Sequence, residues 1–310
     1  MKKEIKVCFL NQWPEYKGLE QFKKRHPYNN KKFELIETNW ESSDLIIFGP
    51  FGGKRTHIGY GKNYYGVPEK YIKFMPVLER IQRKKATLFV TGEYCMPILP
   101  FCDYSISFHN IQSKNHLYQP EWVTSLWELG YDINSLIDNK NLSNSFERNF
   151  CNFIYSRRLE RREKYYKLLS SIDTIDVYGM SFDDDNPVIL PGGSIGKIRK
   201  LKDYKFTISI ENKIRNKYVT EKIIHPIISR SIPIYSGSKK ISNIFNPDFI
   251  IDINSFSDEG LVDYINELNN SKERYEDRLN SPIFLNNKIP SEAKKENSIN
   301  FFDMMFNEVL

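Results

Sequence analysis

Short apolar runs recur along the chain, and they constrain its fold more than any other feature. In the N-terminal half these runs occupy residues 5–10, 33–37, 44–48, 86–90 and 104–108. They are rich in Ile, Val, Leu and Phe, which is typical of parallel strands that are buried on both faces. Between them, residues 71–85 show helical periodicity and end in a basic turn, which suits the C-terminus of a helix.

The same alternation starts again after a polar, Asn- and Ser-rich stretch at residues 132–149, which we interpret as a linker or a surface excursion between domains. The pattern predicts strands at residues 152–155, 174–178, 206–210, 232–235 and 249–253, and helices at 159–171, 219–230, 258–269 and 272–280. Two successive α/β halves of similar size predict two doubly wound, Rossmann-like domains that face a cleft. We therefore expect domains at residues 1–149 and 150–285, followed by a closing helix at 286–310.

The predicted closing helix is amphipathic. The spacing of Ile299, Phe302, Met305, Phe306 and Leu310 places these side chains on one helical face. We favour a helix that packs on one of the domains. A helix that contacts a membrane surface or a partner is the alternative.

Charge and cysteine content narrow the class of protein. The net charge of +6 is spread along the chain among interleaved acidic residues, so we do not expect a nucleic-acid partner. A phosphate-bearing substrate or contact with an anionic membrane surface fits this mild excess. The four cysteines contain no CxxC pair, which indicates reduced, buried thiols in a cytoplasmic protein. We find no signal peptide, and no apolar run approaches the roughly 18 residues of a membrane helix.

The most informative segment follows the predicted strand at 206–210. Glu211 and Asn212 end this strand, a loop of residues 213–217 follows, and a helix begins near Thr220. Ligands of open α/β sheets bind outside the carboxyl ends of strands, and a helix N-terminus there offers N–H groups to phosphate. Lys222 in the first helical turn opposes the helix dipole, which indicates an anionic partner. A plain capped helix with solvated charges explains the spacing equally well.

The texts FTISIEN, YVTEKII and SIPIYSGS, between Phe206 and Ser238, resemble the donor-binding signature of the bacterial-type α-1,3/1,4-fucosyltransferase family. The resemblance implies a GT-B fold, GDP-fucose as the donor and inversion at the anomeric carbon. It also implies that Asn212, Tyr218, Glu221 and Lys222 contact the nucleotide sugar. Glu221 would hold ribose or fucose hydroxyls and Lys222 the phosphates, with Glu211 as a further candidate.

Two upstream segments resemble other parts of this family. The text LFVTGE, ending at Glu93, resembles a strand-Thr-Gly-Glu segment whose Glu is the general base. A carboxylate suits this role because a sugar hydroxyl is a poor nucleophile until its proton is taken. In the basic group at residues 157–162, Arg162 best matches the family's diphosphate-binding Arg, with Arg158 in reserve. An Arg fork can grip phosphate oxygens and neutralise the leaving GDP. The loop at Gly193 resembles the family's glycine-containing loop and is a weaker candidate.

We expect neither a metal nor another cofactor. The acidic run Asp183, Asp184 and Asp185 is ordinary loop text, and the five histidines lack metal-ligand spacing. Arg162 and Lys222 would supply the positive charge that a metal would otherwise provide. Pro226 lies inside a predicted helix and should kink it or shift its start.

Taken together, these observations predict an inverting fucosyltransferase. Its N-terminal domain would bind an oligosaccharide or glycolipid acceptor, and its C-terminal domain the GDP-sugar. We expect an α-1,3 linkage on a surface polysaccharide or lipopolysaccharide, made in the cytoplasm or at the inner face of the membrane. One alternative keeps the fold but uses another GDP-linked deoxysugar. A second, of a different class, is a non-catalytic glycan- or nucleic-acid-binding protein.

Overall fold

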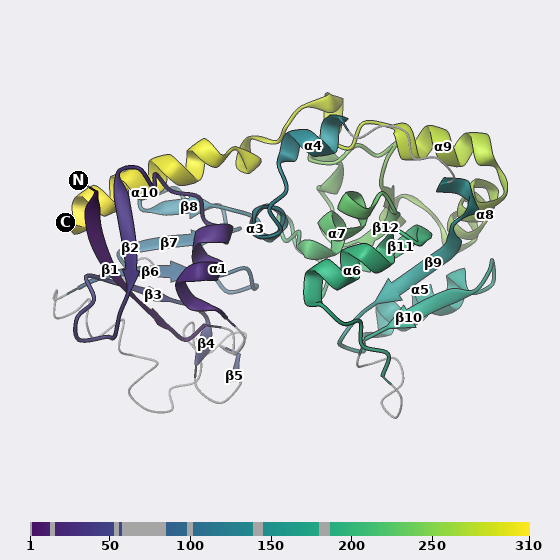
Figure 1. Ribbon diagram of the computed structural model, residues 1–310. Coiled ribbons are helices and arrows are strands. Elements are labelled where there is room, and N and C mark those ends of the chain that lie inside the picture. Colours follow the sequence, from purple (N-terminus) through teal and green to yellow (C-terminus); the bar gives the residue numbers. More distant parts are fainter. Residues whose placement is uncertain are drawn as a thin grey trace. The chain divides into compact units, whose positions relative to one another are not determined.

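A computed structural model describes residues 2–12, 16–52, 56–57, 85–97, 102–138, 145–179 and 187–310 of the protein. The chain divides into two compact units, whose helices and strands are labelled in Figure 1. The first unit contains Met1–Gly130 and Ser291–Leu310, and the second contains Tyr131–Pro290. Nearly all of the helix predicted at residues 71–85, and the run of three Asp at 183–185, lie outside the described residues.

A parallel sheet forms the centre of the first unit. Within the described residues its strand order is β2-β1-β3-β6-β7-β8, and every neighbouring pair is parallel. The strands are β1 (Lys3–Leu10), β2 (Phe33–Glu37), β3 (Leu45–Phe48), β6 (Ala86–Val90), β7 (Tyr104–Ser107) and β8 (His116–Tyr118). Helices α1 (Gly18–Arg25) and α3 (Glu121–Glu128) belong to this unit, as does a short antiparallel pair, β4 (Phe51–Gly52) and β5 (Thr56–His57). The predicted strands are confirmed, and β8 is an addition to them.

The second unit contains another parallel sheet, with the order β10-β9-β11-β12-β13 in the part of the chain that the structure describes. Its strands are β9 (Asn149–Ile154), β10 (Ile175–Tyr178), β11 (Tyr204–Ile210), β12 (Ile232–Ser236) and β13 (Ile251–Asp252). Its helices are α4 (Ile133–Asp138), α5 (Glu160–Leu169), α6 (Gly193–Leu201), α7 (Glu221–Ser229), α8 (Asp258–Asn270) and α9 (Lys272–Asn280). Every residue of β11 and β12 is buried, as the continuous apolar text of these strands predicted.

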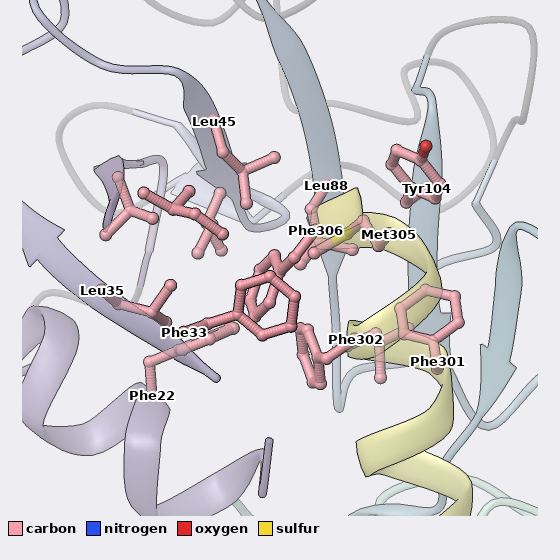
Figure 2. Packing of buried hydrophobic residues seen from close by; sticks show 14 of the residues in the cluster. Phe22, Phe33, Leu35, Leu45, Leu88, Tyr104, Phe301, Phe302, Met305 and Phe306 are labelled. Atoms are coloured by element: carbon pink, nitrogen blue, oxygen red, sulfur yellow. The ribbon is translucent and has the colours of Figure 1, made fainter. Parts of the chain in front are cut away.

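The C-terminal helix α10 (Lys295–Val309) completes the core of the first unit. Figure 2 shows its aromatic side chains among residues from α1, β2, β3 and β6. Phe302 is fully buried, with its ring centroid 5.7 Å from that of Phe22 and 5.3 Å from that of Phe306. The apolar face therefore packs inside the protein, as the favoured interpretation expected. Only its last member, Leu310, is largely exposed.

The boundary between the units lies earlier than we predicted. Residues 131–149 belong to the second unit rather than ending the first. A short 3₁₀ turn (Ser145–Glu147) carries Phe146, whose ring centroid is 5.9 Å from that of Tyr275 on α9. Lys205 of β11 places its Nζ 4.5 Å from the centroid of the Phe146 ring. These contacts attach to the second unit a stretch whose polar composition suggested a linker. The predicted domains are corrected accordingly: α10 belongs with the N-terminal unit.

The cysteine prediction concerns burial. All four cysteines are buried thiols, and burial raises the pKa of the Cys95 thiol to about 12. Their reduced, buried state is thus confirmed. Among the described residues, no helix combines the length and apolar character needed to cross a membrane.

Candidate active site

Glu211 forms the buried centre of the predicted site in the second unit. It follows β11 and has no exposed surface. One carboxylate oxygen, Oε1, accepts the backbone N–H of Thr220 at 2.8 Å, and the other, Oε2, accepts the Thr220 hydroxyl at 2.7 Å. Both oxygens are thus directed at the protein. The geometry gives Glu211 the task of fixing Thr220, whereas the sequence suggested a contact with a ligand.

Thr220 in turn fixes the start of α7. Its backbone is extended, and its hydroxyl oxygen accepts the N–H of Lys222, which makes it the N-cap of the helix that the sequence predicted to begin near this residue. Lys222 Nζ lies 2.8 Å from Glu221 Oε1 and 3.9 Å from Glu211 Oε2. The side chains of Glu221 and Lys222 remain 35% and 21% exposed. These two charged groups are therefore the part of the cluster that a ligand can reach.

The charges in this cluster are mutually dependent. Burial raises the pKa of Glu211 to about 7, although Lys222 opposes the shift. Burial also acts against ionisation of Glu221, but Lys222 and His225 hold the pKa of this carboxyl well below its usual range. The pKa of Lys222 is raised, since Glu221 and Glu211 outweigh the effect of burial. Lys222 is therefore a cation held by two carboxylates, and an anion that binds it would replace Glu221 as its partner.

Two arginines at the start of α5 hold the end of β11. Arg162 is 1% exposed, and its Nη2 donates to the Ile210 carbonyl at 2.8 Å and to Asn212 Oδ1 at 2.9 Å. Arg161 donates from Nη2 to the Glu211 carbonyl at 2.6 Å. Among the described residues, the Nε atoms of both arginines are buried without a hydrogen-bond partner. Arg158, the reserve candidate, is exposed. The observed role of Arg162 is to orient Asn212, and phosphate binding by it stays a prediction.

The remaining candidates of this unit differ in exposure. Tyr218 is only 3% exposed, so its ring offers little surface to a base or sugar. Gly193 is exposed and opens α6 with a φ of +57°, in a turn that Gly192 enters with a φ of +83°. Both glycines adopt backbone angles that other residues rarely adopt. The Gly-Gly text therefore marks the turn into a helix that the sequence analysis did not predict.

The expected effect of Pro226 on α7 is wrong. The helix runs from Glu221 to Ser229 without interruption, and its start is where the Thr220 cap places it. Pro226 costs the hydrogen bond to the Lys222 carbonyl, but the helix ends soon afterwards. Arg230 ends it in the left-handed region, with its N–H bonded to the Ile227 carbonyl and that of Ser231 to Pro226.

Gly237 was not identified from the sequence as part of this site. A Cβ at this position would lie 2.3 Å from the Tyr235 hydroxyl oxygen and 2.6 Å from Glu211 Cγ. The glycine therefore allows the Glu211 side chain to pack under the strand end. Its signal in the sequence was its position directly after the buried strand β12, within the text YSGS.

Glu93, the predicted base, belongs to the first unit and lies just beyond β6. Thr91, two residues before Glu93, is buried, and its hydroxyl oxygen accepts the N–H of Glu93 at 3.0 Å. Glu93 itself is half-buried. Its place at the carboxyl end of a central parallel strand is where sites of such sheets occur. No cluster of acidic, His or Cys side chains suited to a metal ion occurs within the described residues.

Comparison with known proteins supports the resemblance found in the sequence. Residues 147–280 match the family described as glycosyltransferase family 10 (fucosyltransferase) C-term. The matched residues all lie within the second unit. The segments of Glu211 and of Thr220 to Lys222 both fall inside this match. The predicted resemblance to the fucosyltransferases is therefore confirmed.

Similar proteins and structures extend the likeness beyond the residues that match the family. The chain is 24% identical over 306 residues to the alpha-(1,3)-fucosyltransferase FucT of Helicobacter pylori, covering 89% of this chain and 59% of the relative. It is 37% identical over 123 residues to alpha-(1,3)-fucosyltransferase B of Drosophila melanogaster, covering 37% of this chain and 28% of that one. The chain thus spans less than two thirds of the length of these relatives.

The fold is shared over almost the whole chain. A crystal structure of an alpha1,3-fucosyltransferase superimposes with a TM-score of 0.75 at 21% identity, covering 99% of this chain and 91% of that one. A crystal structure of alpha1,3-fucosyltransferase with GDP-fucose gives a TM-score of 0.70 at 22% identity. The α/β class with two parallel sheets, predicted as GT-B, is confirmed.

Proposed function

We propose that the protein is an inverting fucosyltransferase that transfers fucose from GDP-fucose to a hydroxyl group of a glycan. The observation that carries the proposal is the pair of buried hydrogen bonds that Thr220 donates to the Glu211 carboxylate. These bonds hold the start of α7 so that Glu221 and Lys222 are presented together at its first turn. This arrangement lies within the region that matches the fucosyltransferase family.

The donor would bind at this helix start. The Lys222 ammonium takes the diphosphate and exchanges its bond to Glu221 for one to phosphate. Glu221, released from Lys222, accepts hydroxyl groups of ribose or fucose. Asn212, oriented by Arg162, adds an amide contact to the nucleotide sugar. The Nε–H of Arg162 is buried without a hydrogen-bond partner, so its use for the diphosphate would require the start of α5 to move. Tyr218 supports this surface mainly as a buried side chain.

The transfer itself would be a single displacement. The acceptor hydroxyl oxygen forms a bond to the anomeric carbon while the bond from that carbon to GDP breaks on the opposite face. GDP leaves with the bonding electrons, and the positive charge of Lys222 offsets the charge that develops on it. The carboxylate of Glu93 takes the hydroxyl proton. One base suffices for this single displacement, so the proposal includes no covalent intermediate. It includes no metal because Lys222 supplies the positive charge that a metal ion would otherwise provide.

The finer parts of the proposal concern the acceptor and the setting. The Helicobacter pylori relative is named as an alpha-(1,3)-fucosyltransferase, which favours an α-1,3 linkage here. We propose an oligosaccharide or glycolipid of a surface polysaccharide or lipopolysaccharide as the acceptor. The transfer would take place in the cytoplasm, with peripheral contact at the inner face of the membrane.

Transfer assays with purified protein test this proposal. Incubation with GDP-fucose and a panel of glycan acceptors should give fucosylated product and GDP. We expect Lys222→Ala to lower kcat/KM by about 10²-fold, as the loss of one charge-stabilising group does. Lys167→Ala, which alters an exposed lysine of α5, is the matched control and should leave the rate unchanged. Full activity of Lys222→Ala would contradict the donor assignment.

Glu93→Gln separates binding from chemistry. This variant keeps the shape of the side chain but cannot take a proton, so we expect loss of transfer with unchanged affinity for GDP. Competing functions give different results in the same experiments. Transfer from another GDP-linked deoxysugar, but not from GDP-fucose, would mean that the other sugar nucleotide is the donor. Steeply salt-dependent binding of nucleic acid, without GDP affinity, would replace the enzyme by a binding protein.

A further inference from the structure

A buried ion-pair cluster in the first unit lies beside the loop that carries Glu93. Arg25, the last residue of α1, donates from Nη2 to both carboxylate oxygens of Glu121 at 2.6 and 2.7 Å. Its Nη1 donates to Glu128 Oε2 at 2.5 Å. The side chains of Arg25 and Glu121 are only 10% and 15% exposed. A buried ion pair adds little stability compared with well-packed apolar residues. Stability alone therefore does not explain why this ion pair lies at the carboxyl edge of the sheet.

Glu121 packs directly on the backbone of Gly92. A Cβ added at Gly92 would lie 2.1 Å from Glu121 Oε2 and 2.7 Å from Glu121 Cδ. The three atoms nearest to that Cβ all belong to Glu121. Thr124 Oγ1 lies 2.9 Å from Glu121 Oε2 and accepts a bond from Arg25 at 3.0 Å. The carboxylate that touches Gly92 is therefore held from two sides.

We propose that Glu121, held by Arg25, is a positioning residue for Glu93. Its carboxylate seats Gly92 and so sets the direction in which the chain leaves β6. The Thr91 hydroxyl oxygen accepts the Glu93 N–H and so fixes the backbone of Glu93. Glu121 acts through the backbone of Gly92 and takes no part in proton transfer. This inference rests on the proposed function, in which Glu93 is the base.

Glu128 provides a matched control for the inference. Like Glu121, Glu128 is bonded to Arg25. Its other carboxylate oxygen accepts a hydrogen bond at 2.7 Å from Nε2 of Gln21, a residue of α1. Replacing either carboxylate therefore removes an ion pair to the same arginine. The two differ in that Glu121 supplies the atoms nearest to Gly92. An effect on Glu93 that follows Glu121 but not Glu128 belongs to the Gly92 contact rather than to the ion pair.

Amide hydrogen exchange tests the inference without any substrate. We expect Glu121→Ala to raise the exchange rate of the Glu93 amide about 10-fold, because the turn that protects it loses its support. Glu128→Ala should change that rate less than about 2-fold. Gly92→Ala displaces the Glu121 carboxylate from the other side while keeping both charged side chains, and it should also accelerate exchange. This variant keeps the inference testable if Glu121→Ala does not fold. Equal exchange in all three variants and the unaltered protein would overturn the inference.

Kinetics give the second readout. Glu121→Ala should lower kcat by about 10²-fold, as misplacement of a catalytic group by about 1 Å can do, with unchanged GDP affinity. Glu121→Gln, which keeps the contact with Gly92, should recover part of this loss. Equal losses of kcat in Glu121→Ala and Glu128→Ala would overturn the inference. If the unaltered protein transfers no fucose, the proposed function fails, and the exchange rates alone decide whether Glu121 positions Glu93.

Discussion

Truncation of Phe302 tests whether the C-terminal helix belongs to the N-terminal unit. The side chain is fully buried and lies among the rings of Phe22, Tyr28 and Phe306, at centroid distances of 5.7, 6.5 and 5.3 Å. Burial of a Phe side chain contributes about 2–3 kcal/mol. The cavity left by Phe302→Ala raises the expected loss in the free energy of unfolding to about 4 kcal/mol.

Tryptophan fluorescence can follow this loss in one unit alone. All four tryptophans, Trp13, Trp40, Trp122 and Trp127, lie in the part of the chain assigned to the first unit. With a urea dependence of about 2–3 kcal/mol per molar, the midpoint of the tryptophan transition should fall by about 1.3–2 M. Asn300→Ala alters an exposed position of the same helix, and its midpoint should stay close to that of the unaltered protein.

GDP binding by the second unit completes the experiment. Phe302→Ala should leave GDP affinity intact under conditions where the first unit remains folded, because none of the contacts described for Phe302 involves residues 131–290. Two results would refute the reasoning. One is a tryptophan midpoint equal to that of Asn300→Ala. The other is a loss of GDP affinity while the tryptophan transition stays in place.

Three further predictions concern the second unit. Burial raises the pKa of Glu211 to about 7 from an ordinary 4.5, so the native state binds the extra proton between these values. The contribution of Glu211 to the free energy of unfolding should therefore fall by about 3 kcal/mol as the pH rises from 4.5 to 7. Urea unfolding of Glu211→Gln and of the unaltered protein across this range should show this pH dependence only in the unaltered protein. Thr220→Ala should lower the unfolding free energy by about 2 kcal/mol, because it removes the N-cap and one donor to Glu211. It should also weaken GDP binding, measured by calorimetry. Thr220→Ser keeps the hydroxyl and should retain both the stability and the GDP affinity. Gly237→Ala should lower the unfolding free energy by about 1–3 kcal/mol, because the methyl group would press on Glu211 and the Tyr235 ring; an unchanged urea midpoint would refute this packing.

Local sequence patterns predicted much of the fold because the relevant forces are local. Continuous apolar text such as that of β11 is buried on both faces, so its burial needs no knowledge of distant residues. The cap at Thr220 could be predicted for the same reason, since an N-cap bonds to a residue two positions away. The turn carrying Glu221 and Lys222 follows from that cap.

Features that depend on distant contacts were beyond the sequence. The boundary of the second unit follows from Phe146, which packs near Tyr275 more than a hundred residues later in the chain. Placement of α10 on the first unit depends on Phe22 and Phe33 accepting its aromatic face. The sequence supplied four clustered arginines, but only the fold selects Arg161 and Arg162 as the pair that holds the end of β11.

The two units support their candidate residues in the same physical way. In the second, the buried carboxylate of Glu211 is bonded by a Thr and packs on a glycine, and it fixes the turn of Lys222. In the first, the carboxylate of Glu121 lies against a Thr hydroxyl and a glycine, and we infer that it fixes the turn of Glu93.

Buried carboxylates of this kind are costly to desolvate, and apolar residues would fill the same space more stably. Their directional bonds instead hold a backbone turn in one conformation, which a nonpolar contact does less well. Replacing Glu211 or Glu121 alone with an apolar residue of similar size leaves its buried partners unpaired, namely the Thr220 N–H and hydroxyl or part of the Arg25 guanidinium. Stability should therefore fall. The turn carrying Lys222 or Glu93 should also lose its fixed position, so that transfer slows.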